Sequence, residues 1–234
     1  MPKEKPYQCI AFDAVGTLIY PTPAPGEVYY QTARRFGSRL AADEIARRFK
    51  QAFRDSEKRD AAAAGGAGLV TSEKREAERW RGIVASVIDD VPDPAGCFAE
   101  LFAHFKRPEA WSCFEDVPVG MARLREAGFR LAIASNFDSR LHSVCAGHSA
   151  LQQIDLRVVS SEVGHRKPGR AFFEALVAAA GCPAVQVLMV GDDRVSDVCG
   201  AREAGLSAIR LNRSGPAADE IGSLLELCNW LDHH

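Results

Sequence analysis

Five short apolar runs restrict the folds open to this chain, because segments of helical length separate the last four. The runs are typical of buried strands and cover residues 7–12, 130–134, 156–159, 186–190 and 207–211. Gly128, Gly181 and Gly205 end the intervening segments, where helix C-terminal glycines are expected. Strands that alternate with helices predict an α/β fold with a Rossmann-like parallel sheet. Ligands of such sheets bind beyond the carboxyl ends of the strands, so chemistry is expected just after each run.

The interval between the first run and the second, residues 13–129, is too long for a single crossover helix. Four stretches within it repeat apolar side chains at helical spacing, which predicts a small helical bundle. The Pro-rich segment 21–26 precedes this bundle, and Pro108 follows it. A separate helical unit is therefore expected between these two points.

These signals predict a helical cap at 21–107, inserted into an α/β core formed by residues 1–20 and 108–234. The Ala/Gly stretch 61–68 is interpreted as a plain loop between two cap helices, with a lid hinge as the alternative. Two chain crossings, one at each end of the insertion, would connect the cap to the core.

Composition argues against several classes of partner. The chain has 29 lysines and arginines against 31 aspartates and glutamates, a net charge of −2, so no broad nucleic-acid surface is expected. Asp13 interrupts the first run before a signal-peptide core can form, and no other apolar stretch approaches a membrane span. The seven cysteines include no C-x-x-C pair. We expect a cytoplasmic protein with reduced thiols and no nucleic-acid or membrane partner, and we leave its oligomeric state open.

Four short motifs follow the ends of the predicted strands in a fixed order. They are FDAVGTL at 12–18, SN at 135–136, the lysine of HRKPG at 167, and VGDDRVSD at 190–197. Together they resemble the motifs of the haloacid dehalogenase (HAD) superfamily, and the resemblance extends over the predicted core. The insertion is similar to the helical cap of the subfamily whose cap follows the first motif. This resemblance implies a hydrolase that uses Mg²⁺ and acts on a small-molecule phosphoester.

The residue types suit covalent hydrolysis of a phosphomonoester, which needs a carboxylate nucleophile, nearby positive charge and a hydrogen-bonding cradle. Asp13 is the predicted nucleophile and would form an aspartyl-phosphate. Ser135 offers a hydroxyl, Asn136 a backbone N–H and Lys167 a fixed positive charge to the phosphoryl group. Asp13, Ser135 and Lys167 are therefore assigned as catalytic. Thr17 is expected to brace the loop after Asp13 and is grouped with the phosphate-binding residues.

The fourth motif predicts a magnesium site. Asp192 and Asp197 offer the hard carboxylate oxygens that Mg²⁺ prefers. The resemblance adds a carboxylate oxygen of Asp13 and the backbone carbonyl of Val15 as further ligands. Asp193 is either a direct ligand or a partner of the metal's water molecules, and the sequence does not distinguish these roles.

Val15 is a departure from the family pattern, in which phosphatases carry a second aspartate that protonates the leaving oxygen. Valine transfers no proton, and loss of a positioned general acid typically slows a reaction by about 10²–10⁴-fold. Three functions stay open. The first is a phosphohydrolase that is slow or restricted to good leaving groups. The second is a phosphoester-binding or scaffold protein without turnover. The third is a 2-haloacid dehalogenase, against which the acidic fourth motif argues.

Overall fold

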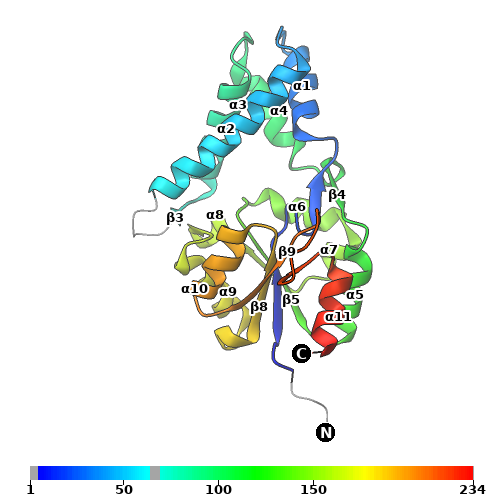
Figure 1. Cartoon of the computed structure of the whole chain (residues 1–234). Helices are drawn as coiled ribbons and strands as arrows, with labels where there is room; N and C mark the ends of the chain where they lie inside the picture. Colours follow the sequence, from blue (N-terminus) through cyan, green and yellow to red (C-terminus); the bar gives the residue numbers. More distant parts are fainter. Residues whose placement is uncertain (1–4, 64–68, 234) are drawn as a thin grey trace.

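The computed structural model describes residues 5–63 and 69–233, with a six-stranded parallel sheet at its centre (Figure 1). The predicted Rossmann-like α/β fold is confirmed, and each of the five predicted runs contains a strand. The two-residue strand β10 was not predicted, because so short a segment carries no periodicity. In spatial order the strands are β10 (Glu220–Ile221), β9 (Ser207–Leu211), β8 (Val187–Gly191), β1 (Cys9–Phe12), β5 (Arg130–Ser135) and β6 (Leu156–Val159).

Helices cover both faces of this sheet. Ile10 and Phe12 of β1 pack on one face, with α5 (Val117–Glu126), α6 (Arg140–Gly147), α7 (Ser149–Gln152) and α11 (Leu224–His233). Cys9 and Ala11 pack on the other, with α9 (Arg170–Ala180) and α10 (Gly200–Glu203). Burial on both faces explains why the central strands β1 and β8 are apolar throughout rather than alternating.

Three glycines, the cysteines and several short helical elements complete the description of the core. The predicted helix C-terminal glycines, Gly128, Gly181 and Gly205, all have positive φ, which confirms that placement. All seven cysteines are free. Among the described helices, none has both the length and the apolar composition needed to cross a membrane. The remaining elements are the 3₁₀ turns Pro108–Ala110 and Ala184–Gln186, the helix α8 (Ser160–Val163) and the π-helical segment Arg194–Cys199.

Four helices lie over the carboxyl ends of the strands, in the upper part of Figure 1. They are α1 (Pro25–Arg35), α2 (Ala42–Ala63), α3 (Glu73–Val87) and α4 (Pro94–His104), and they share an apolar core of their own. Ser72 caps α3 and Asp93 caps α4, each by accepting a backbone N–H. The expected joint at 61–68 needs correction, because α2 continues to Ala63. Residues 64–68 lie outside the described residues.

The chain passes between the core and the cap helices twice, and strands β2 (Ile19–Pro21) and β4 (Trp111–Cys113) pair antiparallel where it enters and leaves the cap. A third connection is not a chain crossing and was not predicted. It pairs β3 (Leu69–Val70) with β7 (His165–Arg166). The segment that leads into Lys167 is thus held directly by the cap.

Arg166 strengthens this third connection through ion pairs with α2 and α3. Its Nη1 lies 2.9 Å from Asp60 Oδ2 and 3.3 Å from Glu76 Oε1, and its Nη2 lies 3.4 Å from Glu57 Oε1. Arg79 of α3 shares Asp60 and Glu57. Because Arg166 is buried, these carboxylates are needed to offset the loss of its hydration.

Arg166→Met should therefore lower the free energy of unfolding by about 3 kcal/mol. This is the lower end of the range for removing one partner of a buried ion pair, because Glu57 and Asp60 stay partly hydrated. Arg170→Met is the matched control, since it breaks an exposed pair with Glu174 and should change stability by less than about 1 kcal/mol. Urea unfolding of both variants measures the difference. Equal losses of unfolding free energy in the two variants would show that the Arg166 ion pairs do not contribute to stability.

Candidate active site

A cavity of about 500 Å³ lies between the carboxyl ends of the strands and the cap helices. The core contributes predicted site residues to its lining: Asp13, Val15, Ser135, Asn136, Lys167, Asp192, Asp193 and Asp197. The cap contributes mainly aromatic side chains from α1, α2 and α3. This volume is within the range of small-molecule sites.

Asp13 is the first residue after β1, which lies between β8 and β5 in the middle of the sheet. Its backbone N–H donates to Val190 of β8 at 2.9 Å, which fixes the start of the loop. Its Oδ1 accepts hydrogen bonds from Ser135 Oγ at 3.1 Å and from Lys167 Nζ at 2.8 Å. Three predicted catalytic residues are thus in direct contact.

The loop after Asp13 turns back sharply. Gly16 has φ +90 and donates its N–H to Ile19 at 2.8 Å, while the N–H groups of Leu18 and Ile19 both donate to the Ala14 carbonyl. A Cβ at Gly16 would lie 2.5 Å from Asp192 Oδ2, so only glycine fits beside that carboxylate.

Thr17 is fully buried and differs in part from its predicted role. Its hydroxyl donates to Asp192 Oδ1 at 3.3 Å, and its carbonyl accepts from Arg213 at 2.7 Å. These contacts suit a brace between the loop and the acidic motif. Thr17 is absent from the cavity lining, so its proposed contact with phosphate lacks structural support.

Lys167 is buried, and all three hydrogens of its ammonium group have acceptors. Nζ donates to Asp13 Oδ1 at 2.8 Å, to Asp197 Oδ1 at 2.6 Å and to the Ala134 carbonyl at 2.7 Å. Burial alone opposes the charged form, but the two carboxylates outweigh it and raise the pKa of Lys167. The lysine therefore stays protonated and supplies permanent positive charge.

Asn136 holds the backbone of this lysine. Its Oδ1 accepts the Lys167 N–H at 2.8 Å, and its Nδ2 donates to the Lys167 carbonyl at 3.0 Å. The sequence predicted only a contact from the Asn136 backbone to phosphate and missed this contact of the side chain. A residue 31 positions away was not identifiable as its partner before the fold was known.

Carboxylate oxygens of Asp13, Asp192 and Asp197 lie within 4.8 Å of one another. Burial, followed by repulsion from Asp13 and Asp197, raises the pKa of Asp192 to about 7. Burial also raises the pKa of Asp197, although Lys167 opposes the shift. Three such close carboxylates are unfavourable when all are ionised, so this cluster favours either a proton or a cation.

Asp193 lies apart from the cluster of three. Its Oδ1 accepts the N–H groups of Val195 at 2.9 Å and Ser196 at 2.6 Å, which caps the π-helical segment. Its own N–H donates to Asp197 Oδ2 at 3.0 Å. Asp193 is outside the group of three close carboxylates, and one of its oxygens caps the π-helical segment, so Asp13 and Asp192 are better placed than Asp193 to bind a metal directly.

The donor set of the cluster fits Mg²⁺, which binds a few carboxylates and keeps several waters. Asp13 and Asp192 are the residues best placed to hold the ion, since Asp197 uses both oxygens for Lys167 and the Asp193 N–H. The Val15 carbonyl remains a ligand implied only by the resemblance. Val15 is 37% exposed and lines the cavity. An apolar side chain therefore occupies the position at which the family's phosphatases carry a proton-donating aspartate.

The sequence missed a set of cavity residues on the cap and around it. Phe49, Phe53 and Trp80 lie in stretches whose apolar side chains repeat at helical spacing, which predicts the apolar face of a helix and no more. Arg140 was not identified, although it is buried and pairs with Asp138 at 2.7 Å. Helical periodicity locates such residues on one face but does not reveal that this face borders a cavity.

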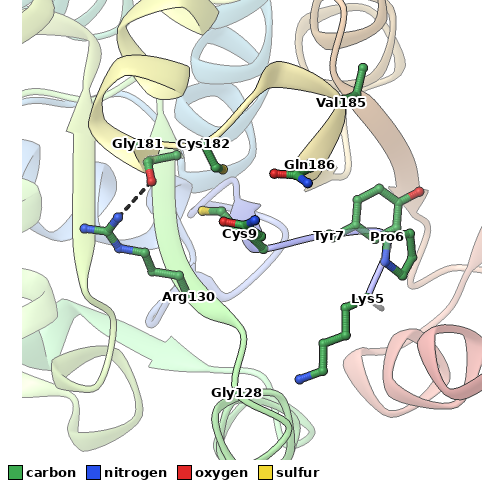
Figure 2. Close-up of a pocket in the computed structure, with 12 residues that line it drawn as sticks. Lys5, Pro6, Tyr7, Cys9, Gly128, Arg130, Gly181, Cys182, Val185 and Gln186 are labelled. Carbon is green, nitrogen blue, oxygen red and sulfur yellow. Dashed lines mark hydrogen bonds between the residues drawn. The ribbon is translucent and has the colours of Figure 1, made fainter. Parts of the chain in front are cut away.

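A second and larger hollow, of about 800 Å³, lies at the opposite end of the strands, among Lys5, Cys9, Arg130 and Gln186 (Figure 2). Arg130 there donates to the Ala180 carbonyl at 2.8 Å, and Lys5 lies over the Phe129 ring. None of the predicted motifs borders it. The smaller cavity is the better candidate, because it lies at the carboxyl ends of parallel strands, where ligands bind.

A carboxylate after a central parallel strand, a buried lysine in contact with it and an acidic cluster beneath the cap helices together define an α/β protein with the site features of a hydrolase. The family described as haloacid dehalogenase-like hydrolase matches residues 7–205. The chain therefore belongs to the haloacid dehalogenase-like hydrolases, as its motifs predicted.

Similarity to known proteins extends along the whole chain. Haloacid dehalogenase-like hydrolase domain-containing protein 3 of Danio rerio is 26% identical over 242 residues, which cover 98% of each chain. Phosphoserine phosphatase of Thermus thermophilus is 30% identical over 123 residues, 52% of this chain and 49% of its own. Pyrimidine 5'-nucleotidase of Escherichia coli is 38% identical over 87 residues, 32% of this chain and 39% of its own.

Solved structures share the fold at low identity. A HAD phosphatase from Thermococcus onnurineus has a TM-score of 0.67 and 22% identity, covering 96% of this chain and 97% of its own. A HAD-hydrolase of Bacillus subtilis bound to magnesium has a TM-score of 0.74 and 18% identity, covering 97% and 100%. L-2-haloacid dehalogenase of Xanthobacter autotrophicus has a TM-score of 0.71 and 18% identity, covering 97% and 98%.

The raised pKa of Asp192 predicts a pH-dependent response to Mg²⁺. Between about pH 4 and 7 the folded protein keeps a proton on Asp192 that the unfolded chain has released, so stability falls as pH rises. The metal-free wild type should thus lose stability relative to Asp192→Asn across this range. Millimolar Mg²⁺ should raise the wild-type melting temperature more at pH 8 than at pH 5. An identical response of Asp192→Asn to Mg²⁺ would contradict the assignment.

Gly16→Ala should destabilise the protein by about 1–3 kcal/mol, since the new Cβ combines a strained positive φ with a clash against Asp192. It should also reduce the increase in melting temperature that Mg²⁺ produces. Gly82→Ala in α3 is the control, because nothing lies within 4 Å of its Cβ position. Differential scanning calorimetry with and without Mg²⁺ measures both effects, and a Gly16→Ala protein as stable as Gly82→Ala would refute the account.

Proposed function

We propose that this protein is a Mg²⁺-dependent phosphoester hydrolase that acts through an aspartyl-phosphate on Asp13. The observation that supports this most directly is the contact of Asp13 with Lys167 and Ser135 at the floor of a small-molecule cavity. The partial similarities to a phosphoserine phosphatase and a nucleotidase agree with it. The cavity volume suits a small phosphorylated metabolite.

In the first step a carboxylate oxygen of Asp13 attacks phosphorus, and the bond from phosphorus to the leaving oxygen breaks. Lys167 keeps its proton and balances the negative charge of Asp13 and the phosphoryl group. The Ser135 hydroxyl can turn from Asp13 toward a phosphoryl oxygen. Mg²⁺, when bound, neutralises further negative charge there. Water then hydrolyses the acyl phosphate and restores Asp13.

Val15 determines which esters this mechanism can use. No proton reaches the leaving oxygen from a valine side chain, so that oxygen must depart as a stable anion. Acyl and aryl phosphates are then substrates, while alkyl and sugar phosphates react far more slowly. Because position 15 has no carboxylate, activation of the water that hydrolyses the aspartyl-phosphate is slower as well.

A screen of phosphoesters with Mg²⁺, and with a chelator in place of Mg²⁺, tests the proposal. Acetyl phosphate and 4-nitrophenyl phosphate should release phosphate only with Mg²⁺, and Asp13→Asn should abolish release. Failure of all activated esters to give phosphate or a phosphoenzyme would leave the phosphoester-binding or scaffold function as the better account.

The dehalogenase alternative has a specific basis, since structures of haloacid dehalogenases share this fold. Such an enzyme displaces halide from carbon and has no need of a metal cluster. The proximity of Asp13, Asp192 and Asp197 therefore favours the phosphohydrolase. Chloride release from 2-chloropropionate that is insensitive to Mg²⁺ would reverse this choice.

Val15→Asp should raise the turnover of alkyl phosphates by up to about 10²-fold and change that of acetyl phosphate much less, because it supplies the missing proton donor. Val15→Asn is the control, because asparagine has a shape similar to that of aspartate but lacks its acidic proton. Steady-state kinetics must include Mg²⁺, since the new carboxylate would be close to Asp13 and Asp192. Equal rates for the two variants on alkyl phosphates would contradict the role assigned to position 15.

A further inference from the structure

We propose that the preferred substrate carries an uncharged aromatic ring on its leaving group, which binds against the aromatic side chains of the cap. This inference rests on the proposed function for the position of the phosphoryl group at Asp13. It goes further by assigning the chemical class of the remainder of the substrate.

Seven aromatic residues form a continuous series of ring contacts along the cavity, which we term the aromatic arc. The centroid distances between successive rings run from 4.8 to 6.4 Å. All seven residues line the cavity, and the series begins in the cap and ends in the core. In order they are Trp80, Phe53, Phe49, Tyr29, Phe105, Trp111 and Phe137.

Part of the aromatic arc is exposed to the cavity rather than buried by other side chains of the protein. Phe53 is 38% exposed, and Phe49 and Trp80 are half-buried at the edge of the cap core. Aromatic faces that border a cavity attract planar rings, both by excluding water and by stacking or edge-to-face contact. A leaving group with a ring would gain both, whereas an alkyl chain or a sugar would gain less.

The charges beside the arc argue against a second anionic group on the substrate, beyond the phosphoryl group. Arg140 is paired with Asp138 through Nε at 2.8 Å and Nη2 at 2.7 Å. Arg79 and Arg166 share the carboxylates of Glu57 and Asp60. Each arginine of the cavity thus already has a carboxylate partner. A second phosphate or carboxylate on the substrate would find no unpaired cation there.

Tyr29 adds one polar group to this surface. The residue is buried in the arc, borders the cavity and contacts the rings of Phe49 and Phe105. Burial raises the pKa of Tyr29, so the hydroxyl stays neutral. A neutral hydroxyl can donate to or accept from a heteroatom on a ligand ring.

Binding of phosphonates separates recognition of the ring from the ability of the leaving group to depart, because a phosphonate is not hydrolysed. With Mg²⁺ present, benzylphosphonate should bind at least tenfold more tightly than methylphosphonate, and phosphonoacetate should bind no more tightly than methylphosphonate. Titration followed by tryptophan fluorescence or calorimetry gives these constants. Equal affinity for benzylphosphonate and methylphosphonate would overturn the inference.

Phe53→Leu and Trp80→Leu should each weaken benzylphosphonate binding by roughly threefold to tenfold and leave methylphosphonate binding unchanged, in keeping with the loss of one aromatic contact. Tyr20→Leu is the matched control, since Tyr20 is an exposed aromatic residue outside the cavity lining. Phe53 is partly exposed, so its variant is expected to fold. An unchanged affinity for benzylphosphonate in both arc variants would contradict the role of the arc.

Kinetics with acetyl phosphate distinguishes failure of this inference from failure of the proposed function. Acetyl phosphate has a good leaving group and no ring, so its turnover by the wild type tests the proposed function without involving the arc. Turnover of acetyl phosphate together with equal phosphonate affinities would reject the ring and keep the phosphohydrolase. Selective binding of benzylphosphonate without turnover of any ester would reject the phosphohydrolase and keep the ring.

Discussion

A single buried ammonium group, Lys167 Nζ, holds together the carboxyl ends of three structural segments. It binds Asp13 after β1, the Ala134 carbonyl in β5 and Asp197 after β8. Without this cation, two carboxylates would face each other in a site shielded from water, which is strongly unfavourable. Asp192 has no such lysine contact, so three carboxylates share one cation. Burial, followed by repulsion from Asp13 and Asp197, raises the pKa of Asp192. This deficit of positive charge is the physical reason why the site suits a divalent metal.

The parts of this arrangement that follow from short-range patterns were predictable. Five of the six strands of the sheet coincide with short apolar runs. Asp13, Ser135 and Asp192 lie at or just beyond the end of a strand, so the topology of a parallel sheet brings them together. Asp193 illustrates the limit of such reasoning. Its position in the motif is compatible with a metal ligand or with a partner of the metal's water molecules. In the structure its carboxylate caps a π-helical segment, which no periodicity in the sequence predicts. Thr17 likewise contacts Asp192 rather than the cavity, because the turn at Gly16 directs it inward.

The cap was predictable as helices and not as one wall of a site. Periodicity places Phe49, Phe53 and Trp80 on apolar faces, and most such residues pack entirely within a bundle. Their exposure to a cavity depends on how the cap sits over the core, which the pairing of β3 with β7 helps to set. That pairing joins residues almost a hundred positions apart and involves two residues on each side, too few to leave a sequence signal.

The β3–β7 pairing also connects the two halves of the proposed chemistry. Arg166 is held by α2 and α3, and the next residue, Lys167, is held by Asp13 and Asp197. A movement of the cap that changed the contacts of Arg166 would be transmitted through one peptide bond to the lysine beside the nucleophile. Cap position and the charge next to Asp13 are therefore not independent in this chain. Under the proposed function, a cap that lines the cavity and also binds the neighbour of Lys167 would couple substrate binding to the geometry of attack. Binding energy used in this way would offset part of the cost of lacking a proton donor at Val15.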